Sequence, residues 1–417
     1  MKPAADADMI IAGAGMAGVT LALGLAKGGL KPILIDPAPF ETQTAESFDG
    51  RASAISLAAF RQWRALGLAP RLAPDAQPIE QILVTDGRSP GAATSPPGAA
   101  WLRFDAAEVA GRGEGDPLGY MLENRHIRAA LAGAAADAGI EVVAPARVAA
   151  MEVCAGWAAV TLDGGRRLVA PLVVGADGKG SFVRREAGIG TVGWDYRQVG
   201  VVATVSIEHD HKGVAYEHFL PAGPFAILPL TGRRVSLVWT ERRAAGGALK
   251  AARSEIFEAH LRRRFGPFLG HVQVEGPRFF YPLGLLLADR LTAPRVALLG
   301  DAAHAIHPIA GQGLNMGLKD AAALAQVLIQ ALRLGEDLGA ESVLGRYARW
   351  RGVDNVGVAL ATDVFNRLFS NDHRLIRIGR DLAMTAVNRF GPARRFFMRE
   401  AGGAVGDLPA LLRGETP

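Results

Sequence analysis

Short apolar runs that end in glycine or in an acidic residue recur along the chain. The first covers 9–12 and leads through a cluster of glycines into an apolar-periodic segment over 19–26. The second covers 32–35 and ends at Asp36. Runs of this length are typical of buried parallel strands, and the periodic segment is typical of a helix. Similar runs predict further strands at 141–143, 157–162, 168–174 and 295–299.

Apolar residues at helical spacing predict the elements between these strands. A loop over 48–53 leads into one predicted helix, which carries Ile55, Leu57, Phe60 and Leu66. Further helices are predicted at 120–138, 254–265 and 313–334, and the remainder to about residue 413 is mostly helical in pattern and rich in arginine.

The pattern changes to antiparallel β-structure between residues 200 and 240. Short apolar runs there are separated by glycine, proline or charged turns, which predicts strands at 201–207, 215–219, 225–230 and 235–240. The segment 86–98 is rich in proline, glycine and serine and predicts an exposed loop or hairpin connection. A nucleotide-binding fold is therefore expected to be interrupted by a β-sheet module and then resumed.

The glycines at 13, 15 and 18 form a GxGxxG pattern between the first strand and its helix. This spacing permits a tight turn, close approach of the backbone to a pyrophosphate, and close packing of helix on strand. The start of the helix offers free N–H groups to phosphates. Asp36 can accept hydrogen bonds from ribose hydroxyls. An ordinary glycine-rich turn is the alternative, but the strand, helix and acid together favour a dinucleotide site.

Two later motifs repeat the arrangement of strand end, glycine and acid. Residues 175–181 read GADGKGS, where Ser181 can cap a short helix, and a plain capped turn explains this motif equally well. Residues 300–315 read GDAAHAIHPIAGQGLN, where Asp301 follows a strand and a loop leads into the long helix. The N-terminus of that helix would stabilise negative charge on a ligand.

A metal site is the competing interpretation of the third motif, through Asp301, His304 and His307. The sequence offers no obvious fourth ligand, and Pro308 stiffens the loop, so no metal is expected.

Composition and charge narrow the class of protein. Among the 417 residues Cys154 is the single cysteine, which excludes an internal disulfide and favours a reducing compartment. No run approaches the roughly 18 apolar residues of a membrane span, and the first residues are not typical of a signal peptide. A cytoplasmic protein is therefore expected. The net charge is +5, but basic residues are mostly interleaved with acidic ones, which argues against nucleic-acid binding.

Five segments of the chain, taken in order, resemble segments of the class A flavoprotein monooxygenases of the p-hydroxybenzoate hydroxylase fold. They are GAGMAG, DGRASAIS, ENRHIRAAL, GADGKGS and GDAAHAIHPIAGQGLNMGLKDAAAL. More narrowly, the chain is similar to the ubiquinone-biosynthesis hydroxylases of the 2-octaprenyl-6-methoxyphenol hydroxylase type, and EHFLPAGPFAILPL points the same way. The resemblance spans essentially the whole chain. It implies a mixed α/β fold in which a Rossmann-like FAD-binding domain is interrupted by an antiparallel β-sheet substrate domain and followed by a C-terminal helical region.

The resemblance also suggests domain boundaries. The FAD-binding domain is expected in three parts, at 1–78, 112–190 and 285–345. A hairpin or loop of the substrate domain is expected at 79–111, its β-sheet at 191–284, and the helical region at 346–417.

Roles for the motif residues follow from the same resemblance. The FAD pyrophosphate would be held by Gly13, Gly15, Met16, Ala17 and Gly18. The ribose and phosphates would be contacted by Asp36, Arg51 and Arg125.

For the remaining motifs, Asp177 would help both FAD and the reduced nicotinamide to dock, and Asp301 would bind the ribityl–pyrophosphate region. The flavin ring and the oxygen site would be bordered by Pro308 and by the backbone of Gly311, Gly313, Leu314 and Asn315, with His307 nearby.

The implied reaction is hydroxylation of a polyprenylated phenol in ubiquinone biosynthesis. NAD(P)H would reduce the flavin, O₂ would add to form a flavin C4a-hydroperoxide, and one oxygen atom would pass to the ring. Because the cofactor supplies the reactivity, no side-chain nucleophile or acid–base pair is expected. The alternatives are a flavin reductase of isoprenoid compounds with a related fold, and a non-catalytic FAD-containing prenyl escort or scaffold.

Two groups of residues admit both a structural and a functional interpretation. A substrate pocket or plain core could contain Ile207, Phe219, Phe225, Ile227, Leu228 and Trp239. A predicted helix over 374–390, with arginines opposite its apolar face, is followed by Arg394, Arg395 and Arg399. These basic residues could form a solvated face. Alternatively, they could contact a ubiquinone-biosynthesis complex or an anionic membrane, and the protein would then lie peripherally on the inner face of the cytoplasmic membrane.

Overall fold

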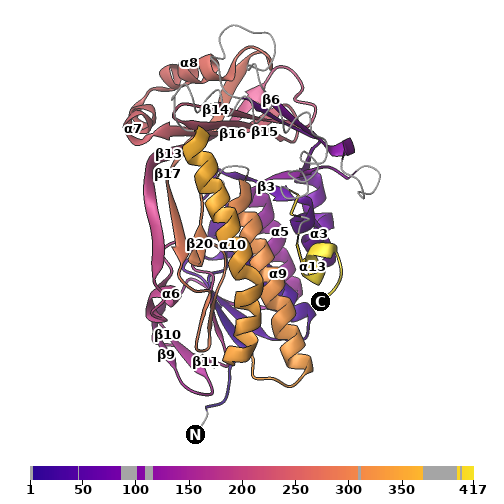
Figure 1. The fold of residues 1–417 in the computed structure, drawn as a ribbon, viewed down its shortest axis with the longest axis vertical. Coiled ribbons are helices and arrows are strands. Elements are labelled where there is room, and N and C mark those ends of the chain that lie inside the picture. The colour runs from indigo at the N-terminus through magenta and orange to yellow at the C-terminus, as the bar shows by residue number, and fades with distance from the viewer. Residues whose placement is uncertain are drawn as a thin grey trace.

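The computed structural model describes residues 3–45, 47–85, 101–108, 116–308, 311–369, 402–403 and 406–417. A parallel sheet with its helices forms one part of the molecule, and a larger, mainly antiparallel sheet forms the other (Figure 1). The long strands β13 and β17 run between the two parts, beside the long helix α10 (Figure 1). The predicted mixed α/β fold is confirmed.

The first part is built on a six-stranded sheet. All neighbouring strands are parallel except the edge pair β18–β19. The spatial order is β18 (Thr292–Ala293), β19 (Val296–Leu298), β12 (Val173–Gly175), β1 (Met9–Ala12), β2 (Pro32–Ile35) and β8 (Glu141–Val143). Every residue of β1, β2, β12 and β19 is buried, as expected for strands covered on both faces.

Helices and smaller elements surround this sheet. Helix α1 (Met16–Lys27) contacts α5 (Asn124–Asp137) and α9 (Gln312–Arg333). Short helices are α2 (Phe40–Thr44), α3 (Leu57–Ala65), α4 (Ala69–Leu72), η1 (Ala73–Asp75), α6 (Phe182–Glu186), η3 (Gly300–Ala302) and α13 (Ala410–Arg413). One three-stranded sheet contains β3 (Ala52–Ser56), β7 (Gly119–Glu123) and β4 (Gln77–Ile79), and another contains β11 (Arg167–Ala170), β10 (Ala158–Leu162) and β9 (Val148–Val153).

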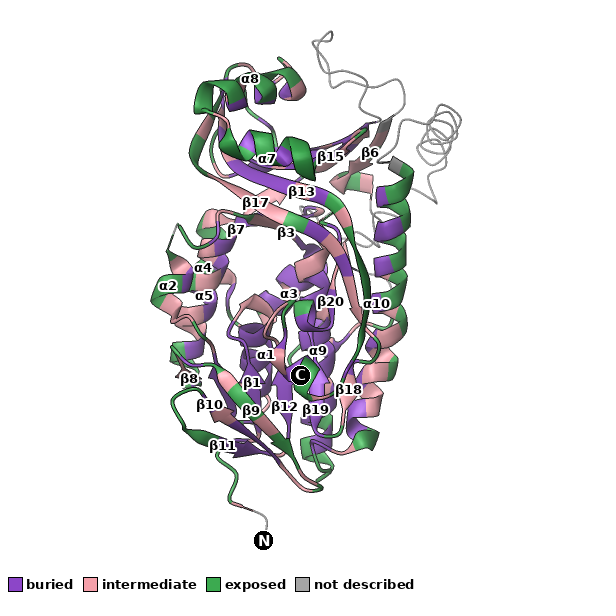
Figure 2. Ribbon diagram, turned by 90° about the vertical axis from the view of Figure 1, so that its left-hand side faces the viewer, coloured by how far each residue is buried: buried purple, intermediate pink, exposed green. Residues whose placement is uncertain are grey.

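The second part is an eight-stranded sheet with α7 (Arg243–Ala251) and α8 (Ser254–Phe265) beside it (Figure 2). Its strands are antiparallel except for the parallel pair β14–β5. The order is β20 (His304–Ala305), β17 (Val272–Ala288), β13 (Thr191–Ile207), β16 (Arg234–Arg242), β15 (Gly223–Leu230), β14 (Val214–Leu220), β5 (Gln81–Thr85) and β6 (Trp101–Asp105), after which η2 (Ala106–Glu108) follows.

Helix α10 (Glu341–Phe369) connects the two parts. It packs beside α9 and also contacts β15 and β17 of the large sheet. Its inner face carries buried polar residues such as Arg351, Asn355 and Asp363, while Val353 and Leu360 are exposed on the outside. No helix in the described ranges is long and apolar enough to cross a membrane.

Several predicted elements differ from those observed. The predicted helix over 120–138 begins only at Asn124, because Tyr120–Glu123 pairs with β3 as strand β7. Ile55 likewise lies on β3 rather than on a helix. The run 168–174 divides into two strands that belong to different sheets. Strand β17 was not predicted. The segment 86–98 and the arginines over 374–399 lie outside the described residues.

Candidate functional site

The first glycine motif forms a loop in which each glycine has a different environment. Gly13 has φ +110°, and a Cβ built on it would lie 2.2 Å from the carbonyl oxygen of Ala176. A Cβ on Gly18 would lie 2.1 Å from the carbonyl oxygen of Gly13. A Cβ on Gly15, in contrast, would meet no atom within 4 Å. The outer glycines are therefore required by the packing, and only Gly15 leaves its backbone open to approach.

Asp36 lies directly against this loop, at the carboxyl end of β2. One of its carboxylate oxygens accepts a hydrogen bond from the Ala14 N–H at 2.8 Å, and the other accepts from the Ala38 N–H at 2.8 Å. The side chain remains partly exposed. Asp36 thus helps to hold the glycine loop and stays within reach of a ligand that lies on it.

The three sequence motifs meet at one edge of the parallel sheet. The strands that precede them, β1, β12 and β19, are neighbours in the sheet. A Cβ on Gly300 (φ +57°) would lie 3.6 Å from the Cβ of Ala17 and 3.8 Å from the Cα of Gly317, which places the third motif against the start of α1 and against α9. Asp301 is exposed at this edge. Met16 and Ala17 are partly buried against the core.

Helix α9 begins beside this edge at Gln312, and its N-cap residue, Gly311, provides no side-chain cap. Gly311, the preceding residue, has φ +63°, and a Cβ on it would lie 3.0 Å from the Cβ of Ala54 on β3. The Asn315 amide donates to the Ala54 carbonyl at 2.8 Å and accepts from the Ser56 N–H at 3.0 Å. Asn315 therefore fixes the first turn of α9 to β3. Gly313 is open, with no atom within 4 Å of a built Cβ, and Leu314 is partly buried.

A buried ionic cluster lies beneath the third motif, on α9. The Asp320 carboxylate accepts from His304 Nε2 at 2.5 Å, from Arg351 Nε at 2.8 Å and from the Gly300 N–H at 3.1 Å. Burial raises the pKa of this carboxyl, but its interactions with His304 and Arg351 outweigh that effect and hold the pKa below the usual range. Asp320 thus ties α9 and α10 to the turn that presents Asp301.

His307 and Pro308 follow this cluster in the chain. His307 is fully buried, and neither ring nitrogen has a hydrogen-bond partner in the described structure. Burial lowers the pKa of His307 to about 4, so the ring is neutral at pH 7. Its ring lies edge-on to Tyr196 at 5.4 Å between centroids, and the Tyr196 hydroxyl donates to Asp363 at 2.9 Å. Pro308 is exposed.

Arg51 belongs to a second buried ionic cluster, centred on Asp49. The Asp49 carboxylate accepts from Arg51 at 2.8 Å, from Asn124 at 2.9 Å and from Arg128 at 2.9 Å. Burial raises the pKa of Asp49, but these hydrogen bonds and charges hold it well below its usual value. The Arg51 guanidinium also lies 4.8 Å from the Tyr281 ring centroid on β17. Asp49 therefore orients Arg51, whose side chain remains half exposed.

Arg125, the other arginine predicted to contact FAD, is the second residue of helix α5 and follows Asn124. It forms an ion pair with Glu123 at 3.4 Å and is partly buried.

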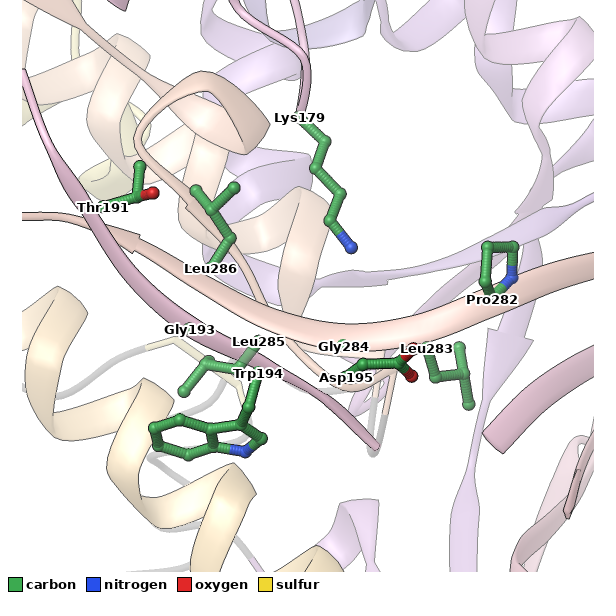
Figure 3. A pocket seen from close by; sticks show the side chains of 10 residues that line it. All are labelled: Lys179, Thr191, Gly193, Trp194, Asp195, Pro282, Leu283, Gly284, Leu285 and Leu286. Atoms are coloured by element: carbon green, nitrogen blue, oxygen red, sulfur yellow. The ribbon is translucent and has the colours of Figure 1, made fainter. Parts of the chain in front are cut away.

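The second motif is a capped turn, as one of the two interpretations predicts. Asp177 accepts from the Phe182 N–H at 2.7 Å, and Ser181 accepts from the Arg184 N–H at 2.9 Å, so both side chains hold the start of α6. The other Asp177 oxygen is buried and has no protein partner among the described residues. The motif also borders a pocket of about 330 Å³ where β13 pairs with β17. Lys179 extends toward these strands (Figure 3).

Side chains of the eight-stranded sheet alternate between two faces. One face carries an aromatic core in which Phe225 and Trp239 pack with Phe257 of α8. On the other face Leu228 clusters with Ala54, and Phe219 packs with Val84 and Leu102. Of the six candidate pocket residues, the aromatic core contains Ile207, Phe225, Ile227 and Trp239, and the opposite face contains Phe219 and Leu228.

Comparison with known proteins agrees with this geometry. A family model described as an FAD binding domain matches residues 6–351. The chain is 45% identical over 412 residues to ubiquinone hydroxylase UbiL of Rhodospirillum rubrum, covering 98% of this chain and 93% of that protein. It is 34% identical to the 3-demethoxyubiquinol 3-hydroxylase of Escherichia coli, covering 95% of this chain and 98% of that protein.

The chain belongs to the FAD-dependent hydroxylases of ubiquinone biosynthesis. The fold is also that of p-nitrophenol 4-monooxygenase PnpA from Pseudomonas putida, with a TM-score of 0.77 and 19% identity over 94% of this chain and 97% of that one. The predicted family resemblance is confirmed.

The residues of the parallel-sheet edge fit the FAD of this family. A pyrophosphate needs an approach to bare backbone at a helix start, and the open position of Gly15 before α1 provides one. The start of α9 provides a second positive helix end. Within the described residues, no group of three or more histidine, cysteine and acidic side chains is arranged to hold a metal ion.

Some polar residues of the hydroxylase were not predicted from the sequence as site residues. Asp320 and Asp49 each neutralise and orient groups from distant segments, and Glu217 lies on the sheet face that bears Phe219. The sequence did offer one signal for the buried cluster: Asp320 is an acidic residue on the apolar side of the helix α9.

Proposed function

We propose that this hydroxylase inserts one oxygen atom of O₂ into the ring of a polyprenylated phenol in ubiquinone biosynthesis, with NAD(P)H as the reductant. The observation that carries the proposal is the position of the α9 start. On one side Gly317 lies against Gly300 and Ala17 of the glycine-loop edge. On the other, Gly311 lies against Ala54, which packs against the same apolar cluster as Leu228 of the large sheet. The cofactor edge and an apolar sheet face therefore meet at one helix terminus.

In this proposal FAD lies along the parallel-sheet edge. Its pyrophosphate is held by the backbone of the loop from Gly13 to Gly18, and its ribose by Asp36 and by the arginines 51 and 125. Asp177 helps both FAD and the reduced nicotinamide to dock, and Asp301 contacts the ribityl–pyrophosphate region. The flavin ring is bordered by Pro308 and the backbone over 311–315, close to His307. When bound, FAD supplies the redox chemistry, namely reduction by NAD(P)H and activation of O₂.

The chain's own residues contribute electrostatics and exclusion of water. The positive end of the helix dipole at the start of α9 stabilises negative charge on a bound cofactor. His307 stays neutral at pH 7, so it adds no fixed charge beside the loop. The apolar side chain of Leu228, which is only partly buried, provides a surface for the substrate ring and its chain. Binding therefore orients the ring in a dry environment.

Turnover with isotopically labelled oxygen tests the proposal. Purified protein with FAD, NADH or NADPH, and a 2-prenylphenol with a short prenyl chain is expected to consume O₂ and to give product that carries one ¹⁸O atom from ¹⁸O₂. Oxidation of NAD(P)H with saturation of the prenyl chain and no ¹⁸O would indicate a reductase instead. Bound FAD without any turnover across prenylphenols would indicate an escort or scaffold.

We also propose that the enzyme contacts an anionic membrane or a ubiquinone-biosynthesis complex peripherally, on the inner face of the cytoplasmic membrane. The support comes from the sequence alone, because the arginines at 394, 395 and 399 lie outside the described residues. Each basic residue near a charged bilayer contributes about 1 kcal/mol. Changing all three to glutamate is expected to abolish co-sedimentation with phosphatidylglycerol vesicles at low salt while FAD content stays unchanged. Unchanged co-sedimentation would overturn the assignment to this segment.

A further inference from the structure

Glu217 is a carboxyl side chain on the apolar face of the eight-stranded sheet. It lies on β14, where side chains alternate between the two faces. Tyr216 and His218, its neighbours in the chain, point to the face of the aromatic core, where Tyr216 packs on Phe268 and His218 stacks near Phe225. Glu217 therefore shares the opposite face with Ala215 and Phe219.

The residues around Glu217 on that face are apolar. It is paired with Ala226 of β15 and with Val84 of β5. One neighbour on its own strand, Ala215, belongs to the cluster that includes Leu228 and Ala54, and the other, Phe219, belongs to the cluster with Val84. Glu217 thus lies between two apolar clusters, one of which contacts the start of α9 through Ala54.

The carboxyl has no partner in the described part of the chain. No hydrogen bond or ion pair is formed by it there, and burial alone raises the pKa of Glu217 to about 8. The side chain is only partly buried, so it keeps surface that a ligand can touch. A carboxyl placed among apolar groups without a partner destabilises the fold, and such groups are retained where a ligand satisfies them.

We propose that Glu217 binds the phenolic hydroxyl of the substrate and thereby sets the orientation of its ring on the sheet face. This proposal rests on the proposed function, which brings a phenol to this face. The hydroxyl donates to a Glu217 oxygen, and the apolar neighbours contact the ring and chain. A protonated carboxyl also donates to an oxygen substituent beside the hydroxyl. The enzyme then binds phenols more tightly than otherwise similar rings that lack the O–H donor.

The test compares a phenol with its methyl ether, which removes the donor and keeps the ring. The probes are a 2-prenylphenol and the matching 2-prenylanisole, and their binding to FAD-loaded enzyme is followed by the change in flavin absorbance. Wild type is expected to bind the phenol about ten- to a hundredfold more tightly. Glu217→Leu is expected to remove this preference by weakening phenol binding alone, and Glu217→Gln, which keeps a carbonyl acceptor, to retain part of it.

Controls separate a binding role from a structural one. FAD content and thermal unfolding are expected to be unchanged or improved in Glu217→Leu, because an unsatisfied carboxyl is removed. The matched variant Glu152→Gln changes an exposed carboxyl on β9 and is expected to keep full discrimination. KM for the phenol is expected to rise in Glu217→Leu, with more NAD(P)H oxidised per product formed.

Two outcomes overturn different statements. If wild type hydroxylates the phenol and Glu217→Leu still prefers it over the ether by the same factor, Glu217 does not bind the hydroxyl. If wild type neither binds the phenol nor incorporates labelled oxygen into it, the proposed function itself is wrong, and the role of Glu217 is wrong with it.

Discussion

The surfaces proposed to bind FAD and substrate are built from different parts of the chain in the two large sheets. At the edge of the parallel sheet the surface is mainly backbone, formed where glycines permit close approach, as at Gly13 and Gly18. On the antiparallel sheet the surface is formed by alternating side chains, and the two faces of one strand have opposite roles, as Glu217 and His218 show on β14. A site made of backbone depends on a few local residues, whereas a site made of side chains depends on which strands pair.

The sharpest test of the backbone edge compares two glycines of the same loop. Gly15→Val is expected to abolish FAD retention but to leave the fold intact, because Gly15 has ordinary extended backbone (φ −71°, ψ 175°) and no atom near a built Cβ. Gly18→Ala is expected to destabilise the fold by about 1–3 kcal/mol or more, because its Cβ would collide with the Gly13 carbonyl.

Flavin content and urea unfolding of both variants measure these two effects. Normal flavin content in Gly15→Val would contradict the assignment of this loop to the pyrophosphate. Unfolding of that variant would contradict the expectation that a side chain at Gly15 leaves the fold intact.

The ionic cluster under the third motif should also be sensitive to a single substitution. Asp320→Asn removes the buried carboxylate that pairs with Arg351 and accepts from His304, leaving Arg351 only its ion pair with Asp354, and breaking a buried pair in this way costs about 3–5 kcal/mol. Tyr347→Phe is the matched control, since it removes a buried hydroxyl that donates to the Leu298 carbonyl at 2.7 Å, a neutral bond that contributes about 0.5–1.5 kcal/mol. Equal losses in urea unfolding would mean that the charge of Asp320 adds nothing.

The antiparallel sheet should respond to mild acid through His218. Burial lowers the pKa of His218 to about 4, against an unfolded value of about 6.5. Between these values the unfolded chain binds a proton that the folded protein excludes. The free energy of unfolding therefore falls as the pH falls through this window, by up to about 1.4 kcal/mol per pH unit for each such histidine. His307, whose pKa is also lowered to about 4, adds a second contribution of the same sign.

His218→Phe is expected to flatten this dependence, because the ring then titrates in neither state. Urea unfolding between pH 7 and pH 4.5 measures the slope, with His209→Gln, a change at an exposed position, as the control. An unchanged slope in His218→Phe would show that the pKa of His218 is the same in the folded and the unfolded protein.

The same contrast explains which features the sequence predicts. The glycine motifs, the strands before them and the cap at Ser181 are local, and all were predicted. Strand β17 was missed because Gly276, Pro282 and Gly284 resemble turn residues, although pairing with β13 across register shifts keeps the segment extended.

Helix α10 shows a second limit of local patterns. The apolar spacing along α10 predicts that Val353 and Leu360 face inward. The buried positions are instead occupied by Arg351, whose partner lies on α9, and by Asp363, whose partner lies on β13. For Glu217 the alternation of β14 was visible, but the side that faces the cofactor edge depends on the parallel pairing of β14 with β5, which joins segments far apart in the chain. Charge pairing and strand order are long-range, so these features required the structure.

The smallest predicted effect concerns a side chain at the backbone edge. Asp301 is exposed beside the glycine loop, so Asp301→Ala is expected to keep the fold and to weaken FAD binding about ten- to a hundredfold, or about 1.5–3 kcal/mol, through loss of one charge-assisted hydrogen bond. Titration of the apoprotein with FAD measures the change, with Asp289→Ala, another exposed acid, as the control. Because the backbone supplies most contacts at this edge, the loss of FAD affinity in Asp301→Ala is expected to be smaller than the loss in Gly15→Val. Affinity equal to wild type would leave Asp301 outside the FAD site.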